Sequence, residues 1–243
     1  MSLYLIGIGI EPKDLSLKAL EALKLCEEVF LETYTSPFAF DAVQSLEKII
    51  DKKIKILQRP ELEENSHQII DLAKNKNIAV LIPGDPLAAT THFQIVLEAL
   101  NSKIKCEVIH AQSIFTLVAR TGLQLYKFGK ACSIPNFYSE TPYFVLEQNL
   151  SIAAHTLFLI DLNLSLAQAI DLLLKLEEKF KKNIFTSSTL CLACSCLGRD
   201  KEKIVYGESE KIKNLNLEKP LSLIVPSDLH FLEAEALERF KIS

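Results

Sequence analysis

Three short segments combine glycine, proline and polar residues in a way that suits ligand binding. Each follows a short apolar run typical of a buried strand. The segments are Gly7-Ile8-Gly9-Ile10-Glu11-Pro12, Pro83 to His92, and His110-Ala111-Gln112-Ser113-Ile114. Glycine allows a backbone to approach another group closely, and ligands of open parallel sheets bind outside the carboxyl ends of the strands. The three segments are therefore predicted to line one site for a small molecule.

Asp85 is the most informative acid in the chain, because it stands between Gly84 and Pro86 directly after an apolar run. One interpretation makes it the N-cap of a helix that begins near Leu87 or Ala88. The other makes it a polar anchor for a ligand at the sheet edge. The two interpretations are compatible, since a capping loop also presents backbone groups to a ligand.

The glycine pair Gly7 and Gly9 invites comparison with dinucleotide-binding loops, and Glu32 stands where a ribose-binding acid would. The third glycine of that fingerprint is replaced by Pro12, which lacks the N–H and the slimness needed beside a pyrophosphate. A nicotinamide-dependent oxidoreductase is thus disfavoured, although it remains the alternative from a different class. No phosphate-binding G-x-x-x-x-G-K-[ST] loop occurs.

Cysteine and histidine form no recognisable metal or nucleophile motif. Cys191, Cys194 and Cys196 lie in an apolar stretch, and no nearby histidine or fourth cysteine completes a tetrahedral set. Packing in the core is their expected role. The five histidines form no H-x-x-x-H pair, and no G-x-S-x-G elbow is present. We therefore expect no metal, and we assign no catalytic nucleophile.

The composition points to a folded globular protein of 243 residues, 49% hydrophobic and 24% charged. Its net charge is −4 and only four of 27 basic residues are arginine, so no nucleic-acid partner is expected. No apolar run approaches the roughly 18 residues that a membrane span needs. With no secretory signal in view, the sequence predicts a cytoplasmic protein without a membrane partner.

The elements that must position the three segments alternate between strand and helix. Strands are predicted near 3–7, 29–31, 54–57, 78–82 and 107–109. Helices are predicted near 15–25 (with Asp14 as N-cap), 39–50, 62–74 and 88–100. Five strands joined by helices of this length require a doubly wound, mostly parallel sheet. We assign this N-terminal α/β lobe to residues 1–110.

Residues 111–243 are assigned to a second, less regular α/β lobe. Its strands are expected near 131–134, 155–161, 189–197, 203–206 and 221–225. Its helices are expected near 112–122, 142–150, 165–182 and 228–241.

Several segments resemble the diphthine synthase family, which belongs to the tetrapyrrole-methylase-like class of S-adenosylmethionine (SAM) methyltransferases. The resemblance spans almost the whole chain. Its segments are Tyr4-Leu5-Ile6-Gly7-Ile8-Gly9, Leu31-Glu32-Thr33-Tyr34-Thr35-Ser36, Pro83-Gly84-Asp85-Pro86-Leu87-Ala88-Ala89-Thr90-Thr91-His92, His110-Ala111-Gln112-Ser113-Ile114 and Gly122-Leu123-Gln124-Leu125-Tyr126-Lys127-Phe128-Gly129. The combination of the 83–92 loop with the 122–129 run is the specific part.

The resemblance implies two α/β lobes with SAM in the cleft between them, and a homodimer. It implies an N-methyltransferase that trimethylates the amino group of the 3-amino-3-carboxypropyl-histidine of translation elongation factor 2. The products are diphthine and S-adenosylhomocysteine. The residues implied to contact SAM are Ile10, Asp85, Ala88, Ser113 and Ile114 from the first lobe, and Ile160, Leu197 and Leu221 from the second.

Three alternatives keep SAM as the ligand. One is a tetramethylating enzyme, a diphthine methyl ester synthase, which adds a fourth methyl to the carboxylate. Another is a methyltransferase of the same fold that acts on a tetrapyrrole or corrin precursor, against which the 122–129 run argues. The third, a SAM-binding scaffold without turnover, is disfavoured by the intact loops at 84–92 and 110–114.

Overall fold

The chain divides into two units, Met1–Phe115 and Thr116–Ser243, in a computed structural model that describes residues 1–35 and 40–242. Ser36 of the 31–36 segment and Ala39 at the start of the expected helix 39–50 lie outside the described residues. The boundary expected after residue 110 corresponds to the end of the fifth strand.

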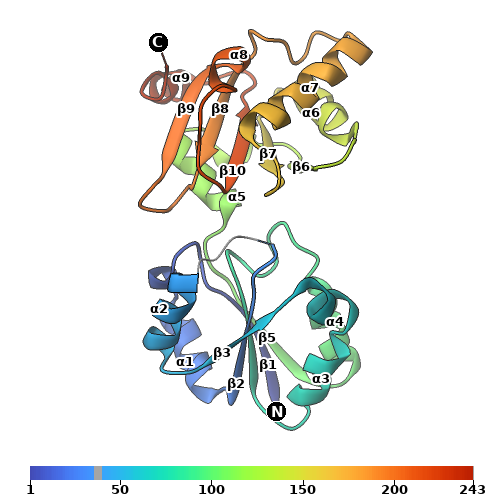
Figure 1. Cartoon of the computed structure of the whole chain (residues 1–243), viewed down its shortest axis with the longest axis vertical. Coiled ribbons are helices and arrows are strands. Elements are labelled where there is room, and N and C mark those ends of the chain that lie inside the picture. The colour runs from blue at the N-terminus through green and yellow to red at the C-terminus, as the bar shows by residue number, and fades with distance from the viewer. Residues whose placement is uncertain (36–39, 243) are drawn as a thin grey trace. The chain divides into compact units, whose positions relative to one another are not determined.

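The first unit contains a five-stranded parallel sheet in the order β3-β2-β4-β1-β5 (Figure 1). Its strands are β1 (Ser2–Gly7), β2 (Glu28–Glu32), β3 (Ile54–Leu57), β4 (Ile78–Ile82) and β5 (Lys105–Ile109). Its helices are α1 (Leu17–Leu25), α2 (Phe40–Ile50), α3 (His67–Ala73) and α4 (Phe93–Asn101), with a 3₁₀ turn at Pro12–Asp14 and a π turn at Pro60–Glu64. The predicted doubly wound parallel sheet is confirmed.

The two faces of this sheet bury alternate side chains of each strand. On β1, Leu3 and Leu5 pack toward α3 and α4, whereas Tyr4 and Ile6 pack toward α1 and α2 (Figure 1). Every residue of β4 is buried, as expected for a strand covered on both faces. This packing fixes the carboxyl ends of the strands at one edge of the unit.

The start of α1 differs from the prediction. Ser16 caps this helix by accepting the Ala19 N–H at 3.1 Å. Asp14, the predicted cap, instead turns back and accepts the N–H groups of Ile10 and Glu11, both at 2.9 Å. The prediction is wrong because a 3₁₀ turn separates the aspartate from the helix.

The start of α4 also differs, and with it one interpretation of Asp85. The helix begins at Phe93 and not near residue 88. Ala89 has a φ of 57°, in the left-handed region that a right-handed helix does not accept. Asp85 is therefore not a helix N-cap.

The second unit contains a mixed sheet in the order β6-β7-β10-β8-β9, in which only β6 and β7 are parallel. Its strands are β6 (Cys132–Ile134), β7 (Thr156–Ile160), β8 (Leu190–Ser195), β9 (Lys203–Glu208) and β10 (Leu221–Val225). Its helices are α6 (Thr141–Ser151), α7 (Leu166–Phe180), α8 (Ser209–Ile212) and α9 (Phe231–Glu238). The helix expected near 112–122 is the short α5 (Ile114–Leu117) followed by a 3₁₀ turn (Val118–Thr121), and another 3₁₀ turn spans Leu125–Lys127.

The 122–129 run is built around one buried carboxylate. Glu233 of α9 has a fully buried side chain. It accepts the Gln124 N–H at 2.8 Å, Lys127 Nζ at 2.6 Å and His155 Nε2 at 3.1 Å. Burial raises the pKa of this carboxyl, but the hydrogen bonds outweigh burial and lower the pKa to about 2. Glu233 therefore ties the run to α9.

Glu233→Gln is expected to lower the free energy of unfolding by about 3 kcal/mol at neutral pH, because it leaves the partly buried Lys127 without its counter-charge and weakens the hydrogen bonds that the buried carboxylate accepts from Gln124 and His155. The folded pKa lies below the ordinary value of 4.5, so this stabilisation is present above that pH and is lost as the pH falls toward 2. The difference in free energy of unfolding between wild type and variant, measured by urea titration, should therefore become smaller as the pH falls from 4.5 toward 2. Glu235→Gln, on an exposed position of α9, is the control; an equal effect there would contradict the assignment.

Candidate active site at the carboxyl edge of the parallel sheet

The three segments singled out in the sequence meet at the carboxyl edge of the first sheet. They follow β1, β4 and β5, which are neighbours in the order β4-β1-β5. Gly9 and Gly84 form an antiparallel bridge beyond the strands. The Gly84 N–H donates to the Gly9 carbonyl at 2.7 Å, and the Gly9 N–H donates to the Gly84 carbonyl at 3.3 Å. This convergence supports the prediction that the three segments line one site for a small molecule.

Gly7 is the point at which all three segments touch. A Cβ atom at this position would lie 2.7 Å from the Gly84 carbonyl oxygen, 2.8 Å from Pro86 Cδ and 2.9 Å from Ala111 Cβ. These distances are below any normal carbon contact, and the atoms belong to backbone, a proline ring and a Cβ that cannot swing away. Only glycine fits, so residue 7 sets how closely the loops approach.

The Asp85 carboxylate joins the loop after β4 to the loop after β5. Its Oδ1 accepts the Leu87 N–H at 2.9 Å. Its Oδ2 accepts the Ala111 N–H at 3.1 Å and lies 2.8 Å from His110 Nδ1. The Asp85 side chain is 13% exposed and that of His110 is 68% exposed. Asp85 thus orders two loops, and its carboxylate stays partly exposed to solvent at the carboxyl ends of the strands.

His110 is the partner that sequence reasoning leaves without a role. Its only signal in the sequence is its place directly after the fifth predicted strand. A histidine there acquires meaning once the loop path sets it against Asp85, 25 positions away along the chain.

The five residues implied for SAM in the first unit all lie along this edge. Ile10 follows β1, Asp85 and Ala88 follow β4, and Ser113 and Ile114 follow β5. Ser113 is buried, whereas the other four are partly exposed. Together they offer a carboxylate, a hydroxyl and apolar surface, the mixture typical of small-molecule sites.

The three residues implied in the second unit lie at the same end of the neighbouring strands β7, β10 and β8. Ile160 ends β7, and Leu221 begins the antiparallel β10 beside it. Leu221 also pairs with Ser195 at the end of β8, and Leu197 follows two residues later. All three side chains are at most 7% exposed. Their contact with a methyl donor stays a prediction.

The polar groups that a dinucleotide would need are already used. The N–H groups of Ile10 and Glu11, beside the glycine pair, donate to Asp14. The buried Glu32 carboxylate accepts the N–H groups of Tyr34 and Thr35 at 3.0 Å each. A carboxylate in place of the pyrophosphate repels phosphate, which supports the argument from sequence against a nicotinamide site.

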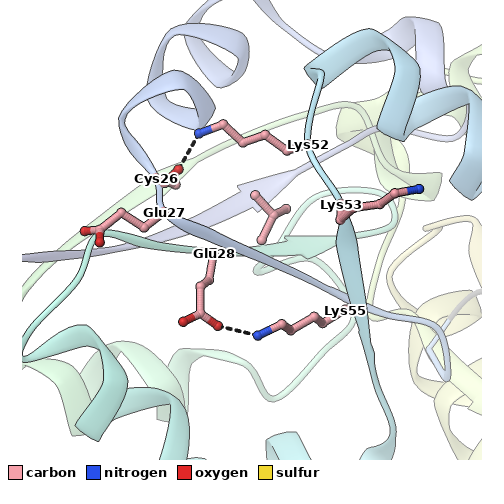
Figure 2. Close-up of a pocket in the computed structure, with 7 residues that line it drawn as sticks. Cys26, Glu27, Glu28, Lys52, Lys53 and Lys55 are labelled. Carbon is pink, nitrogen blue, oxygen red and sulfur yellow. Dashed lines mark hydrogen bonds and ion pairs between the residues drawn. The ribbon is translucent and has the colours of Figure 1, made fainter.

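A depression of about 520 Å³ lies at the opposite, amino-terminal ends of β2 and β3, and Figure 2 shows the residues that line it. Lysines that line the depression form contacts with other residues of the protein. Lys55 pairs with Glu28 at 2.6 Å, and Lys52 donates to the carbonyl of Cys26. Because the amino ends of parallel strands lie away from their carboxyl ends, this depression is separate from the candidate site.

The three clustered cysteines of the second unit are buried. Cys191 belongs to its hydrophobic core. Burial raises the pKa of the Cys194 thiol to about 12 and also raises that of Cys191. Over the residues that the structure describes, no group of three potential ligands is placed to hold a metal ion. No helix of that part is long and apolar enough to cross a membrane.

A chain with two α/β units, the first built on a parallel sheet, can be compared with known protein families. The Tetrapyrrole (Corrin/Porphyrin) Methylases family matches residues 2–213, and the chain belongs to it. It therefore is a methyltransferase that uses a methyl donor of the SAM type.

Individual relatives show which branch of this family the chain resembles. The chain is 36% identical to the diphthine synthase of Methanocaldococcus jannaschii, over 97% of both chains. It is 36% identical to that of Archaeoglobus fulgidus, over 98% of this chain and 95% of the relative. A crystal structure of a diphthine synthase matches with a TM-score of 0.90 at 34% identity, covering 99% of this chain and 96% of the other. Within the tetrapyrrole methylases, the chain belongs to the diphthine synthase family.

Gly7→Ala is expected to lower the free energy of unfolding by about 2–3 kcal/mol, because the added methyl group overpacks a point where three loops meet. Gly84→Ala is the matched comparison. There a Cβ meets only Ser113 Cβ at 3.9 Å, and the cost comes from a φ of 78°, about 1 kcal/mol. Urea unfolding of the two variants gives the order, and a costlier Gly84→Ala would contradict the steric assignment.

Proposed function

We propose that this protein trimethylates the amino nitrogen of the 3-amino-3-carboxypropyl group on a histidine of translation elongation factor 2, giving diphthine on the route to diphthamide. SAM is the donor and S-adenosylhomocysteine the product. The observation that carries the proposal is the match to diphthine synthases over almost the full length, in sequence and in structure.

The loops at the carboxyl edge fit such a donor. Gly84 lies beside open space, since a Cβ there would make one contact at ordinary distance. The partly exposed carboxylate of Asp85 can accept hydrogen bonds from hydroxyl or amino groups of a ligand. The partly exposed side chains of Ile10 and Ile114 can pack on a purine. We propose that these residues, with Ala88 and Ser113, hold SAM. A sulfonium donor supplies an activated methyl carbon with a neutral thioether as leaving group.

The reaction asks the protein for orientation more than for acid–base chemistry. The lone pair of the amine forms the new C–N bond while the C–S bond breaks and its electron pair stays on sulfur. The nitrogen then loses a proton to water before the next transfer, and the third transfer leaves a quaternary ammonium. Because α-amino groups have a pKa of about 8, a useful fraction is neutral at physiological pH. Alignment of amine and methyl therefore supplies most of the acceleration, and we assign no general base.

We further propose a homodimer that works in the cytoplasm, with elongation factor 2 as its protein substrate and no nucleic-acid or membrane partner. The resemblance to the family supports this assignment. The apolar side chains of Phe231 and Leu232, which are 71% and 54% exposed on α9, are surface of the kind that protein partners cover.

Intact-mass measurement tests the reaction. Elongation factor 2 carrying the aminocarboxypropyl histidine, incubated with the protein and SAM, is expected to gain three methyl groups in place of the three protons of its ammonium. A gain of four would assign the protein to the ester-forming enzymes. No gain, with SAM binding shown separately, would overturn the assigned substrate and leave a methyltransferase of the same fold.

Asp85→Ala tests the donor site. It removes the acceptor for two backbone N–H groups and for the ligand, so we expect SAM affinity to fall roughly tenfold or more and the free energy of unfolding to fall by about 1–2 kcal/mol. Calorimetric titration with SAM and urea unfolding measure the two effects. Asp200→Ala, at an exposed position, is the control. Unchanged SAM affinity with reduced stability would make Asp85 a loop clamp only.

A further inference from the structure

A second polar group lies on the β2–β3 half of the same carboxyl edge. Glu32 at the end of β2 pairs with Leu57 at the end of β3. Two residues further along each chain segment stand Tyr34 and Arg59, and this register places them side by side. The Arg59 guanidinium carbon lies over the Tyr34 ring, 5.0 Å from its centroid.

The Arg59 guanidinium keeps hydrogen-bonding capacity toward solvent. Its side chain is 63% exposed, and its ion pair with Glu63 is 3.8 Å long, beyond hydrogen-bond distance. A guanidinium presents several N–H donors in a planar fork that matches a carboxylate. Arg59 thus stacks on Tyr34 and has N–H donors available to a carboxylate from solvent.

The Tyr34 hydroxyl is fixed by a buried histidine. His92 Nε2 lies 3.3 Å from this hydroxyl, and the two rings meet edge to face. His92 is only 2% exposed, and the backbone of Pro86 also forms a hydrogen bond with its side chain. Burial lowers the pKa of His92 to about 4, so the imidazole is neutral. The neutral, buried ring therefore holds the Tyr34 hydroxyl in one position.

The loop that ends at His92 connects this polar group to the proposed donor site. At its start, Asp85 contacts the loop after β5 and Gly84 bridges to Gly9. At its end, His92 contacts Tyr34 after β2. One loop therefore contacts both halves of the edge.

We propose that Arg59 and Tyr34 form the acceptor subsite, in which Arg59 binds the carboxylate of an α-amino-acid-like group and the Tyr34 hydroxyl accepts a hydrogen bond from its amine. The inference rests on the proposed function, whose acceptor carries an amine and a carboxylate on one carbon. His92 Nε2 shares a hydrogen bond with the Tyr34 hydroxyl, so the imidazole is a positioning group. The amine lone pair stays free to attack the methyl carbon.

The charges around the subsite suit this acceptor. Burial and then the charges of Glu32 and Glu63 raise the pKa of Tyr34, so the phenol keeps its proton. Glu63 is partly exposed, lies 3.8 Å from Arg59 and also interacts with Tyr34, so its charge is close to both residues of the subsite. Arg59 balances the acceptor carboxylate. An acceptor without a carboxylate, such as a simple alkylamine, lacks the group that Arg59 binds.

Arg59→Ala tests the subsite against Arg239→Ala, a loss of an exposed arginine in the second unit. We expect the KM for elongation factor 2 carrying the aminocarboxypropyl histidine to rise roughly tenfold or more in Arg59→Ala, with Arg59→Lys in between. The Kd for SAM and the melting temperature should match those of Arg239→Ala. When the acceptor carboxylate is replaced by a primary amide, wild type should lose the same factor and Arg59→Ala should lose little more.

Tyr34→Phe keeps the ring and removes the hydroxyl, and we expect kcat to fall roughly tenfold at unchanged SAM affinity. His92→Gln should lower kcat in wild type and add little in the Tyr34→Phe background, a pattern that a purely structural role does not produce.

The outcomes separate this inference from the proposed function. If wild type transfers no methyl group to the factor, both fall. If wild type is active and Arg59→Ala behaves as Arg239→Ala does, only the acceptor subsite is overturned. Loss of SAM affinity in Arg59→Ala equal to its loss of activity overturns it as well.

Discussion

The close approach of three loops at Gly7 is the constraint on which the site depends. The parallel sheet brings the ends of β1, β4 and β5 to one edge, but the loops can meet only because residue 7 has no side chain. From that contact follow the Gly9–Gly84 bridge and the reach of Asp85 to the loop after β5. Loops fixed to one another by backbone contacts at the ends of a rigid sheet can orient a ligand with few side chains, which suits a reaction governed by alignment.

Carboxylates order the loops of this protein. Asp14, Glu32 and Asp85 each accept backbone N–H groups of the loop in which they stand or of its neighbour. In the second unit, Glu233 does the same for the run at 122–129. Buried carboxylates bonded in this way stabilise loops that have little regular structure. They also make the edge unfavourable for phosphate groups, so the same feature that orders the loops selects against nucleotides bound through phosphate.

Much of the fold follows from local sequence, and the failures are instructive. The apolar runs predict all five strands of the first sheet. They are longest in β1 and β4, which are covered on both faces, whereas the edge strands β3 and β5 are partly exposed and carry charged residues. The start of α4 fails, since the 83–92 loop has helix-compatible residues such as Ala88 and Ala89 but follows a path that puts Ala89 at a positive φ. The prediction of Asp14 as N-cap is wrong for a similar reason. Asp14 and Ser16 are both suitable caps for α1, and only the geometry of the 3₁₀ turn decides between them.

The sequence by itself determined the parallel architecture of the first unit and the family to which the chain belongs, and Pro12 gave an argument against a dinucleotide loop. These depend on residue types at short spacing. Only the tertiary structure decided the partners of the key side chains: His110 beside Asp85, His92 beside Tyr34, and Lys127 on Glu233, which stand 25, 58 and 106 positions apart. Such pairs depend on the strand order and on the path of each loop, which the packing of the whole unit sets and no local pattern encodes.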